Sequence, residues 1–258
     1  MPESAPLLSR PAPHVALLEF NRPQGANRIQ PEDLAVMRAH LLDCEASPDI
    51  HVLVLAGRGR HFSAGFDLRA LAGQPAGSQP PDAAFEQLAD AIERSRLATL
   101  AAINGAVIGG ATDLALACDL RIGSPAAQMQ MPAARFGLPL YAGALQRYVS
   151  RLGLNHAKRL VMTAARIAAD EMLSIGFLSE IVPSEELPSR ALALARLMAE
   201  MPPAPLAAMK RAMNAAALGE GTSAECREAL RNAFDGPQIG ARIGALASRP
   251  AADEQADR

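Results

Sequence analysis

NGAVIGGATDLALACDLRI, the stretch from Asn104 to Ile122, decides the fold of this chain. Its glycine pair, Gly109 and Gly110, leads directly into small and apolar residues with helical spacing. The first N–H groups of a helix have no partner within the helix, and the helix dipole attracts negative charge to that end. The stretch therefore predicts a buried strand, a turn and a helix whose first turn offers an N–H to an anionic group.

A second glycine segment, HFSAGFDL, runs from His61 to Leu68. Its glycine also stands beside a backbone N–H, that of Phe66. Two N–H donors that converge on one point form an oxyanion hole, which stabilises charge developing on a carbonyl oxygen. Taken alone, Gly109-Gly110 is better explained as a tight turn between strand and helix. The two segments together favour the oxyanion hole.

Composition and charge exclude several classes of protein. The formal net charge of −2 provides no basic surface for nucleic acid. Three scattered cysteines without a C-x-x-C pair argue against a disulfide framework or a zinc site, so no metal is expected. The longest apolar stretch, 97–112, is interrupted by Asn104 and glycines, so no membrane span is expected. Without a signal-peptide pattern, we expect a soluble cytoplasmic protein.

Ser63 raises the possibility of a serine hydrolase, which the surrounding residues argue against. The G-x-S-x-G nucleophile turn needs glycine two residues before the serine, and His61 stands there. Neither a P-loop nor a G-x-G-x-x-G dinucleotide fingerprint is present.

The remaining pattern predicts a parallel α/β arrangement followed by helices. The region 72–82, rich in Gly, Pro and Ser, predicts a loop. The Pro202-Pro203 pair separates a core, 1–200, from a helical region, 201–258. Strands are expected at 14–20, 51–57, 97–103, 119–122 and 181–183, and helices at 31–44, 143–152, 154–163, 168–175, 186–201, 204–217 and 222–234.

Four segments in order resemble the crotonase (enoyl-CoA hydratase/isomerase) superfamily. FSAGFDL resembles its F-[SA]-A-G-x-D-[LI] segment, and NGAVIGGATDLALACD resembles N-G-x-x-x-G-G-[GA]-x-[ED]-L-A-x-x-C-D. FNRPQGAN at 20–27 resembles the early L-N-R-P-x-x-x-N turn. Pro132 with FGLPLYAG at 136–143 resembles P-E-x-x-x-G-x-x-P-x-x-G. The resemblance implies a spiral of β-β-α units, and a C-terminal helical region that assembles trimers or hexamers.

The resemblance also implies where an acyl-CoA thioester binds. The N–H groups of Phe66 and Gly110 become the oxyanion donors. Arg69 corresponds to a cation near the coenzyme A phosphates, although a solvated arginine explains it equally well. The remaining substrate-binding positions implied by the matched segments are Ala64, Asp67, Leu68 and Ala133, while Met131 and Arg135 are weaker candidates.

Asp113 occupies the position of the first catalytic glutamate of the hydratases. An acid in the first helical turn is also favourable through the helix dipole alone, so the catalytic role is not the only interpretation. Tyr141 stands where many members have glycine, and its phenol is a candidate proton donor or a packing residue.

The second hydratase glutamate is replaced by Ala133, which puts hydration in doubt because water addition needs two groups. A single carboxylate suits isomerisation, decarboxylation or thioester hydrolysis. No cofactor is expected beyond the coenzyme A of the substrate. Two alternatives stay open: an acyl-CoA-binding pseudo-enzyme without turnover, and an unrelated α/β scaffold protein.

Overall fold

The computed structural model describes residues 4–71, 81–219, 223–234 and 240. The chain divides into two compact units, Met1–Met201 and Pro202–Arg258. The sequence-based boundary between residues 200 and 201 lies next to this division. Every strand described below belongs to the first unit.

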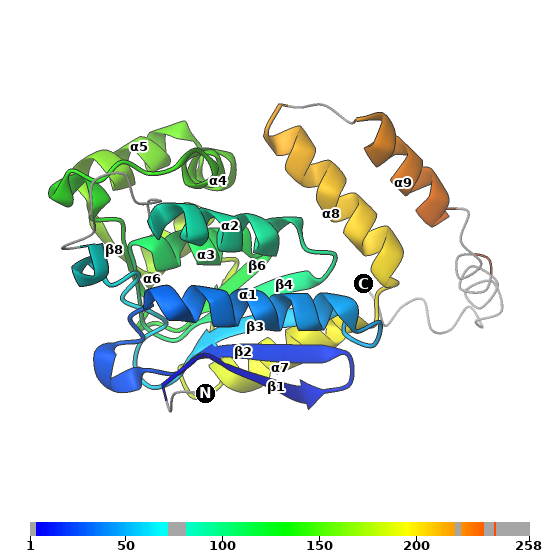
Figure 1. Cartoon of the computed structure of the whole chain (residues 1–258), viewed down its shortest axis with the longest axis horizontal. Coiled ribbons are helices and arrows are strands. Elements are labelled where there is room, and N and C mark those ends of the chain that lie inside the picture. The colour runs from blue at the N-terminus through cyan, green and yellow to red at the C-terminus, as the bar shows by residue number, and fades with distance from the viewer. Residues whose placement is uncertain (1–3, 72–80, 220–222, 235–239, 241–258) are drawn as a thin grey trace. The chain divides into compact units, whose positions relative to one another are not determined.

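The first unit contains a larger and a smaller sheet (Figure 1). In the larger sheet the order is β1-β2-β3-β4-β6-β9, and only β1 and β2 pair antiparallel. In the smaller sheet β5 pairs parallel with β7, and β7 pairs antiparallel with β8. The strands are β1 (Leu7–Ala12), β2 (Val15–Phe20), β3 (Val52–Gly57), β4 (Ala98–Ile103), β5 (Ala106–Ile108), β6 (Leu120–Gly123), β7 (Gln128–Gln130), β8 (Arg166–Ala168) and β9 (Glu180–Ile181).

The helices follow the strands in a repeated β-β-α order. The α-helices of this unit are α1 (Pro31–Ala46), α2 (Pro81–Arg94), α3 (Gly110–Ala117), α4 (Ala142–Leu152), α5 (Leu154–Thr163), α6 (Ala169–Ser174) and α7 (Leu187–Ala199). β4 and β6 join the larger sheet, whereas β5 and β7, which follow them, join the smaller one. The chain therefore winds as a spiral of β-β-α units, the expected fold class.

Strand alternation explains how the larger sheet is covered on two faces, because successive side chains point to opposite sides. Leu53 and Leu55 of β3 join the main core with Met37 of α1. Val54, between them, borders a cavity with Leu187 of α7. The buried helix α3 lies inside the main core, with every residue from 111 to 117 buried.

Most predicted elements agree with the structure to within a few residues, but four strands and one α-helix of this unit were missed. β5, β7 and β8 have three residues each, too few to give a periodic pattern. β1 is a largely exposed edge strand containing Pro11, so it lacks an apolar alternation. α2 begins at Pro81, inside the predicted loop 72–82, of which residues 72–80 lie outside the described residues.

The second unit contains α8 (Pro203–Ala217) and α9 (Ala224–Phe234), close to the expected helices. Pro203 opens α8, where a missing N–H costs nothing. Met209 and Met213 of α8 are exposed in the single chain. Within the described residues, no helix is long and apolar enough to cross a membrane.

Candidate active site

The two glycine segments meet at the smaller sheet. Ser63 forms an isolated parallel bridge with Val107 of β5. The Ser63 N–H donates to the carbonyl of Ala106 (3.1 Å), and the Ile108 N–H donates to the carbonyl of Ser63 (3.0 Å). These backbone bonds bring the residues that follow Ser63 alongside the turn that precedes α3.

Gly65 allows the closest approach between the segments. Its φ is +82°, and a Cβ built on it would lie 2.4 Å from the carbonyl oxygen of Ile108. The same Cβ would lie 3.3 Å from the backbone nitrogen of Gly110. Only glycine fits there, because any side chain meets both backbone strain and a backbone atom.

Two N–H groups at this junction are available to a ligand. Phe66 and Gly110 both border one cavity, and neither N–H donates a hydrogen bond to the described part of the chain. Gly109 keeps the turn open with φ +57°, and its own N–H donates to the carbonyl of Gln130 (2.8 Å). Gly110 begins α3, so the helix dipole also favours negative charge at this position.

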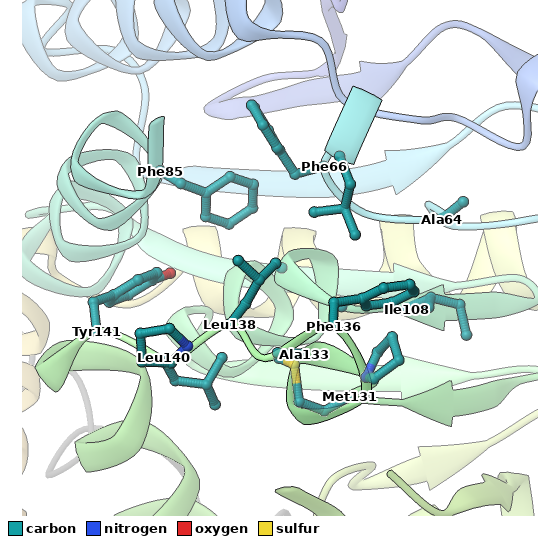
Figure 2. Close-up of a pocket in the computed structure, with 15 residues that line it drawn as sticks. Ala64, Phe66, Phe85, Ile108, Met131, Ala133, Phe136, Leu138, Leu140 and Tyr141 are labelled. Atoms are coloured by element: carbon teal, nitrogen blue, oxygen red, sulfur yellow. The ribbon is translucent and has the colours of Figure 1, made fainter. Parts of the chain in front are cut away.

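The cavity has a volume of about 280 Å³, and most of the side chains that line it are apolar (Figure 2). Phe66 and Phe85 meet edge to face with ring centroids 6.2 Å apart. Apart from backbone groups, the polar exception is the phenol of Tyr141. The complete lining is Ala64, Phe66, Leu68, Phe85, Ile108, Gly109, Gly110, Met131, Pro132, Ala133, Phe136, Leu138, Pro139, Leu140 and Tyr141.

The substrate-binding positions expected from the sequence separate into two groups. Ala64, Leu68 and Ala133 line the cavity. Asp67 and Arg69 are not among its described lining residues, and the Arg69 side chain is exposed.

Asp67 organises the segment that carries Phe66. Its carboxylate accepts hydrogen bonds from the Gln30 side chain (3.1 Å) and the Arg69 N–H (3.1 Å), and it pairs with Arg28 (3.7 Å). The Gln30 hydrogen bond, followed by those from Arg69, lowers the pKa of Asp67 below its ordinary value. The described contacts of Asp67 therefore stabilise the loop.

Ser63 has a structural role in its described contacts. Its buried hydroxyl donates to the carbonyl of Asn27 (2.7 Å) and accepts the N–H of Gly65 (3.0 Å). The described contacts include no histidine that would activate it. This arrangement agrees with the argument against a serine nucleophile.

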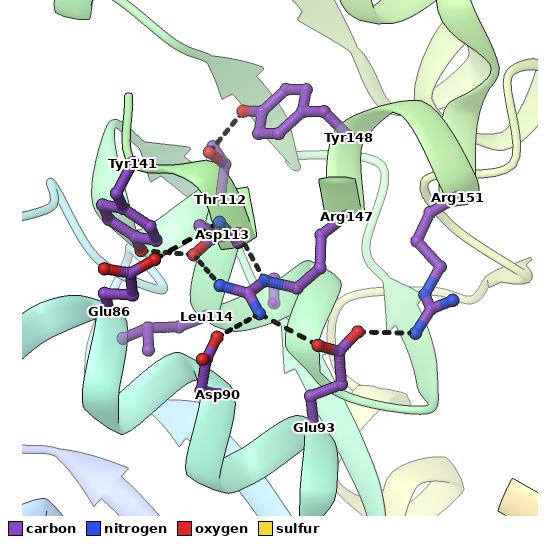
Figure 3. Close-up of polar contacts among 12 residues, drawn as sticks. Glu86, Asp90, Glu93, Thr112, Asp113, Leu114, Tyr141, Arg147, Tyr148 and Arg151 are labelled. Carbon is purple, nitrogen blue, oxygen red and sulfur yellow. Dashed lines mark hydrogen bonds and ion pairs between the residues drawn. The ribbon is translucent and has the colours of Figure 1, made fainter. Parts of the chain in front are cut away.

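Asp113 is not among the residues that line the cavity, and Figure 3 shows its side chain in contact with Arg147 and Tyr141. Its side chain is 1% exposed and forms a bidentate pair with Arg147, Nε to Oδ1 at 2.8 Å and Nη2 to Oδ2 at 2.9 Å. The hydroxyl of Tyr141 donates a short hydrogen bond to Oδ2. The expected placement of this carboxylate beside a bound thioester is therefore not direct, since its contact with the cavity runs through Tyr141.

Arg147 is shared by three carboxylates. Besides Asp113, its Nη1 contacts Asp90 (2.8 Å) and Glu93 (3.0 Å) of α2. Arg151 in turn pairs with Glu93 (2.9 Å). Burial lowers the pKa of Arg147, but the hydrogen bonds that it donates to Asp113 and Asp90, together with the charges of the carboxylates, outweigh burial, so the pKa stands above its ordinary value.

Tyr141 connects this ion cluster to the cavity. It precedes α4 and lines the cavity, while its hydroxyl contacts Asp113. Burial, and then the charge of Asp113, raise the pKa of Tyr141 well above its ordinary value. The phenol is therefore held protonated and donates its hydrogen bond inward.

Sequence reasoning missed Arg147, Asp90 and Glu93, as well as Phe85. One signal for Arg147 was available, because it shares the buried face of α4 with Ala144, Tyr148 and Leu152. A charged side chain at an apolar position of an amphipathic helix indicates a buried partner. Nothing comparable in the sequence indicated which carboxylates would bind Arg147.

Replacing Gly65 with alanine is expected to lower the free energy of unfolding by about 2–5 kcal/mol, combining left-handed strain with a backbone clash. Gly109→Ala is the matched control, because its φ is also positive but nothing lies within 4 Å of the added Cβ. Gly109→Ala should lower the free energy of unfolding by the backbone strain alone, about 1–3 kcal/mol. Urea unfolding of both variants measures the difference. Equal losses would show that the contact with Ile108 is unimportant.

The chain is similar to one known protein family along most of its length. The family model described as enoyl-CoA hydratase/isomerase matches residues 12–243. Mevalonyl-coenzyme A hydratase SIDH of Beauveria bassiana (strain ARSEF 2860) is 35% identical over 68% of this chain and 66% of that protein. The peroxisomal Delta(3,5)-Delta(2,4)-dienoyl-CoA isomerase of Arabidopsis thaliana is 32% identical over 65% of each chain.

Solved structures extend the similarity over nearly the whole chain. The crystal structure of an enoyl-CoA hydratase from Bacillus anthracis superposes with a TM-score of 0.85 and 26% identity, covering 94% of this chain and 95% of that one. These relatives are named as enzymes, so the comparisons do not support a pseudo-enzyme, and the family match excludes an unrelated scaffold. The chain therefore belongs to the enoyl-CoA hydratase/isomerase family, and it is an enzyme that processes acyl-CoA thioesters.

Proposed function

We propose that this enzyme shifts the double bond of an enoyl-CoA whose acyl group is an uncharged hydrocarbon. The observation that carries the proposal is the cavity wall, where Tyr141 is the single titratable side chain among the described lining residues. It hydrogen-bonds to one buried carboxylate, that of Asp113. One proton-transfer unit suits a reaction in which the same group removes and returns a proton.

The proposed steps conserve atoms and charge. The Cα–H bond of a 3-enoyl thioester breaks, its proton passes to the Tyr141 oxygen, and the phenolic proton moves to Oδ2 of Asp113. The electron pair forms a dienolate. Returning a proton from Tyr141 to the γ-carbon, while Asp113 returns its own to Tyr141, gives the 2-enoyl thioester.

The backbone supplies the stabilisation of the dienolate. Its oxygen would accept hydrogen bonds from the N–H groups of Phe66 and Gly110, which have no acceptor in the described part of the chain. Such fixed donors in a water-poor site stabilise developing charge strongly, and removing one typically costs about 100- to 1000-fold in rate. No redox group or metal takes part in these steps.

The lining also supports the proposed class of acyl group. Phe85, Ile108 and Leu138 present apolar surface, and no charged side chain is among the described lining residues. An acyl carboxylate placed there would lose its hydration without gaining a cation. Arg69, outside this wall, remains a candidate for the coenzyme A phosphates.

Incubation with saturated, 2-enoyl, 3-enoyl and malonyl-CoA thioesters, followed by mass spectrometry and product chromatography, tests the proposal. Conversion of 3-enoyl to 2-enoyl thioester, with little hydration or decarboxylation, is expected. Calorimetry should also show stronger binding of the thioester than of the free acid. Rapid hydration or decarboxylation without isomerisation would refute the assigned reaction.

Hydration is expected to become measurable when Ala133 is replaced by glutamate, because this cavity residue occupies the position of the missing carboxylate. We expect an increase of about tenfold or more in hydration of a short 2-enoyl-CoA. Ala134→Glu is the control, since Ala134 is exposed and not among the lining residues. Equal rates for the two variants would contradict the interpretation of Ala133.

We further propose assembly as a homotrimer or homohexamer in the cytoplasm. The exposed methionines of α8 support assembly through the second unit, because they offer apolar surface to another subunit. Light scattering measures the oligomeric state.

A further inference from the structure

The cluster behind Tyr141 carries an excess of carboxylates at its buried centre. Asp113, Asp90 and Glu93 share Arg147, and Arg151 pairs with Glu93. These five groups comprise three carboxylates and two guanidinium groups. Protonating one carboxylate would balance their charges, and Asp113 is the member in contact with the cavity residue Tyr141.

Other charged and polar groups surround this centre. Arg121 is a buried guanidinium that adds positive charge near Arg151; burial, and to a smaller extent the charge of Arg151, lowers its pKa to about 10. Arg94 contacts Asp90 (3.2 Å), but its side chain is 78% exposed and solvent screens its charge. Tyr148 is buried and neutral, with its hydroxyl bonded to that of Thr112, and burial raises its pKa. Glu86 of α2 accepts the N–H of Gly143 (3.3 Å) and adds negative charge near Tyr141 (Figure 3).

We propose that Arg147, Asp90 and Glu93 are positioning residues that tune Asp113 to hold a proton reversibly during turnover. The inference rests on the proposed relay through Tyr141. Arg147 fixes both oxygens of Asp113, while the two carboxylates of α2 divide its positive charge (Figure 3). An arginine paired with Asp113 alone would direct its whole positive charge to that carboxylate.

The arrangement predicts opposite effects from two substitutions. Asp90→Asn removes a negative charge, so Arg147 acts more strongly on Asp113 and makes it a weaker base. Arg151→Met removes a positive charge and leaves Glu93 to compete more strongly for Arg147, which makes Asp113 a stronger base. A general loss of structure would not shift the acid limb of the pH profile in opposite directions in the two variants.

The test is the pH dependence of kcat/KM for the 3-enoyl thioester. The acid limb of the kcat/KM profile should shift to lower pH by roughly 0.5–1 unit in Asp90→Asn. It should shift to higher pH by a similar amount in Arg151→Met. The plateau kcat of Asp90→Asn should fall about threefold to tenfold, with KM nearly unchanged. A ¹³C titration of the aspartate carboxyl carbons measures the same displacement without substrate.

Glu180→Gln is the matched control, because Glu180 forms a bidentate pair with Arg190 (2.8 and 2.9 Å) at the surface. Its pH profile should equal that of the wild type. Shifts in the same direction, or none, in the two cluster variants would overturn the inference. If Asp113→Asn retains wild-type isomerisation, the relay itself fails. An inactive Asp113→Asn with unshifted cluster variants would leave the relay intact and refute only the tuning.

Discussion

Replacing Asp113 with asparagine is expected to lower kcat at least about a hundredfold while thioester affinity changes little. Asparagine preserves the size of the side chain but cannot take up the phenolic proton of Tyr141, so the loss falls on the transition state. Steady-state kinetics with the 3-enoyl thioester and calorimetric binding measure the two quantities separately.

A second effect of Asp113→Asn must be measured in parallel. The substitution removes a charged partner of the buried Arg147, so the free energy of unfolding should also fall. Asp33→Asn is the control, because Asp33 is a buried aspartate paired with Arg22 (2.6 Å) and is not among the cavity lining. It should lose stability and keep turnover. Retained turnover in folded Asp113→Asn would move the proton acceptor elsewhere.

Replacing Arg147 with methionine is expected to lower the free energy of unfolding by about 3–5 kcal/mol at pH 7. Methionine fills much of the same space, but three carboxylates lose the guanidinium that they share. Leaving a buried charge uncompensated costs more than the intact ion pair contributes. Urea unfolding at pH 7 measures the loss.

Arg190→Met provides the corresponding control at the surface. Arg190 binds Glu180 with similar fork geometry, yet both side chains are partly exposed, so the expected loss is below about 1 kcal/mol. If Arg147→Met fails to fold, Arg147→Lys keeps the charge without the fork and should show an intermediate loss. Equal losses for Arg147→Met and Arg190→Met would contradict the importance of burial.

Much of the fold was predictable because its elements carry local signals. The apolar runs of β3 and β4 and the amphipathic pattern of the later helices are properties of neighbouring residues. The three-residue strands escaped prediction because their pairing partners lie far along the chain. Ser63 and Val107 form their bridge across more than forty intervening residues, and nothing near either one specifies the other.

The sequence by itself predicted the family, the junction of the two glycine segments and the presence of Phe66, Gly110 and Tyr141 at one cavity. Such features depend on residue type at fixed spacing, and the structure adds the reason for one of these residue types, since Gly65 has a positive φ that favours glycine. The same spacing also showed that Ala133 stands where the hydratases carry their second catalytic glutamate.

The tertiary structure alone decided the surroundings of Asp113. A carboxylate in the first turn of a helix has the same sequence signature whether it faces a substrate or an arginine. Packing α2 and α4 around α3 brings Asp90, Glu93 and Arg147 to it, and Tyr141 over it. Its electrostatic environment arises from charges distant in sequence and adjacent in space, since Coulomb interactions depend on distance and burial rather than on chain order.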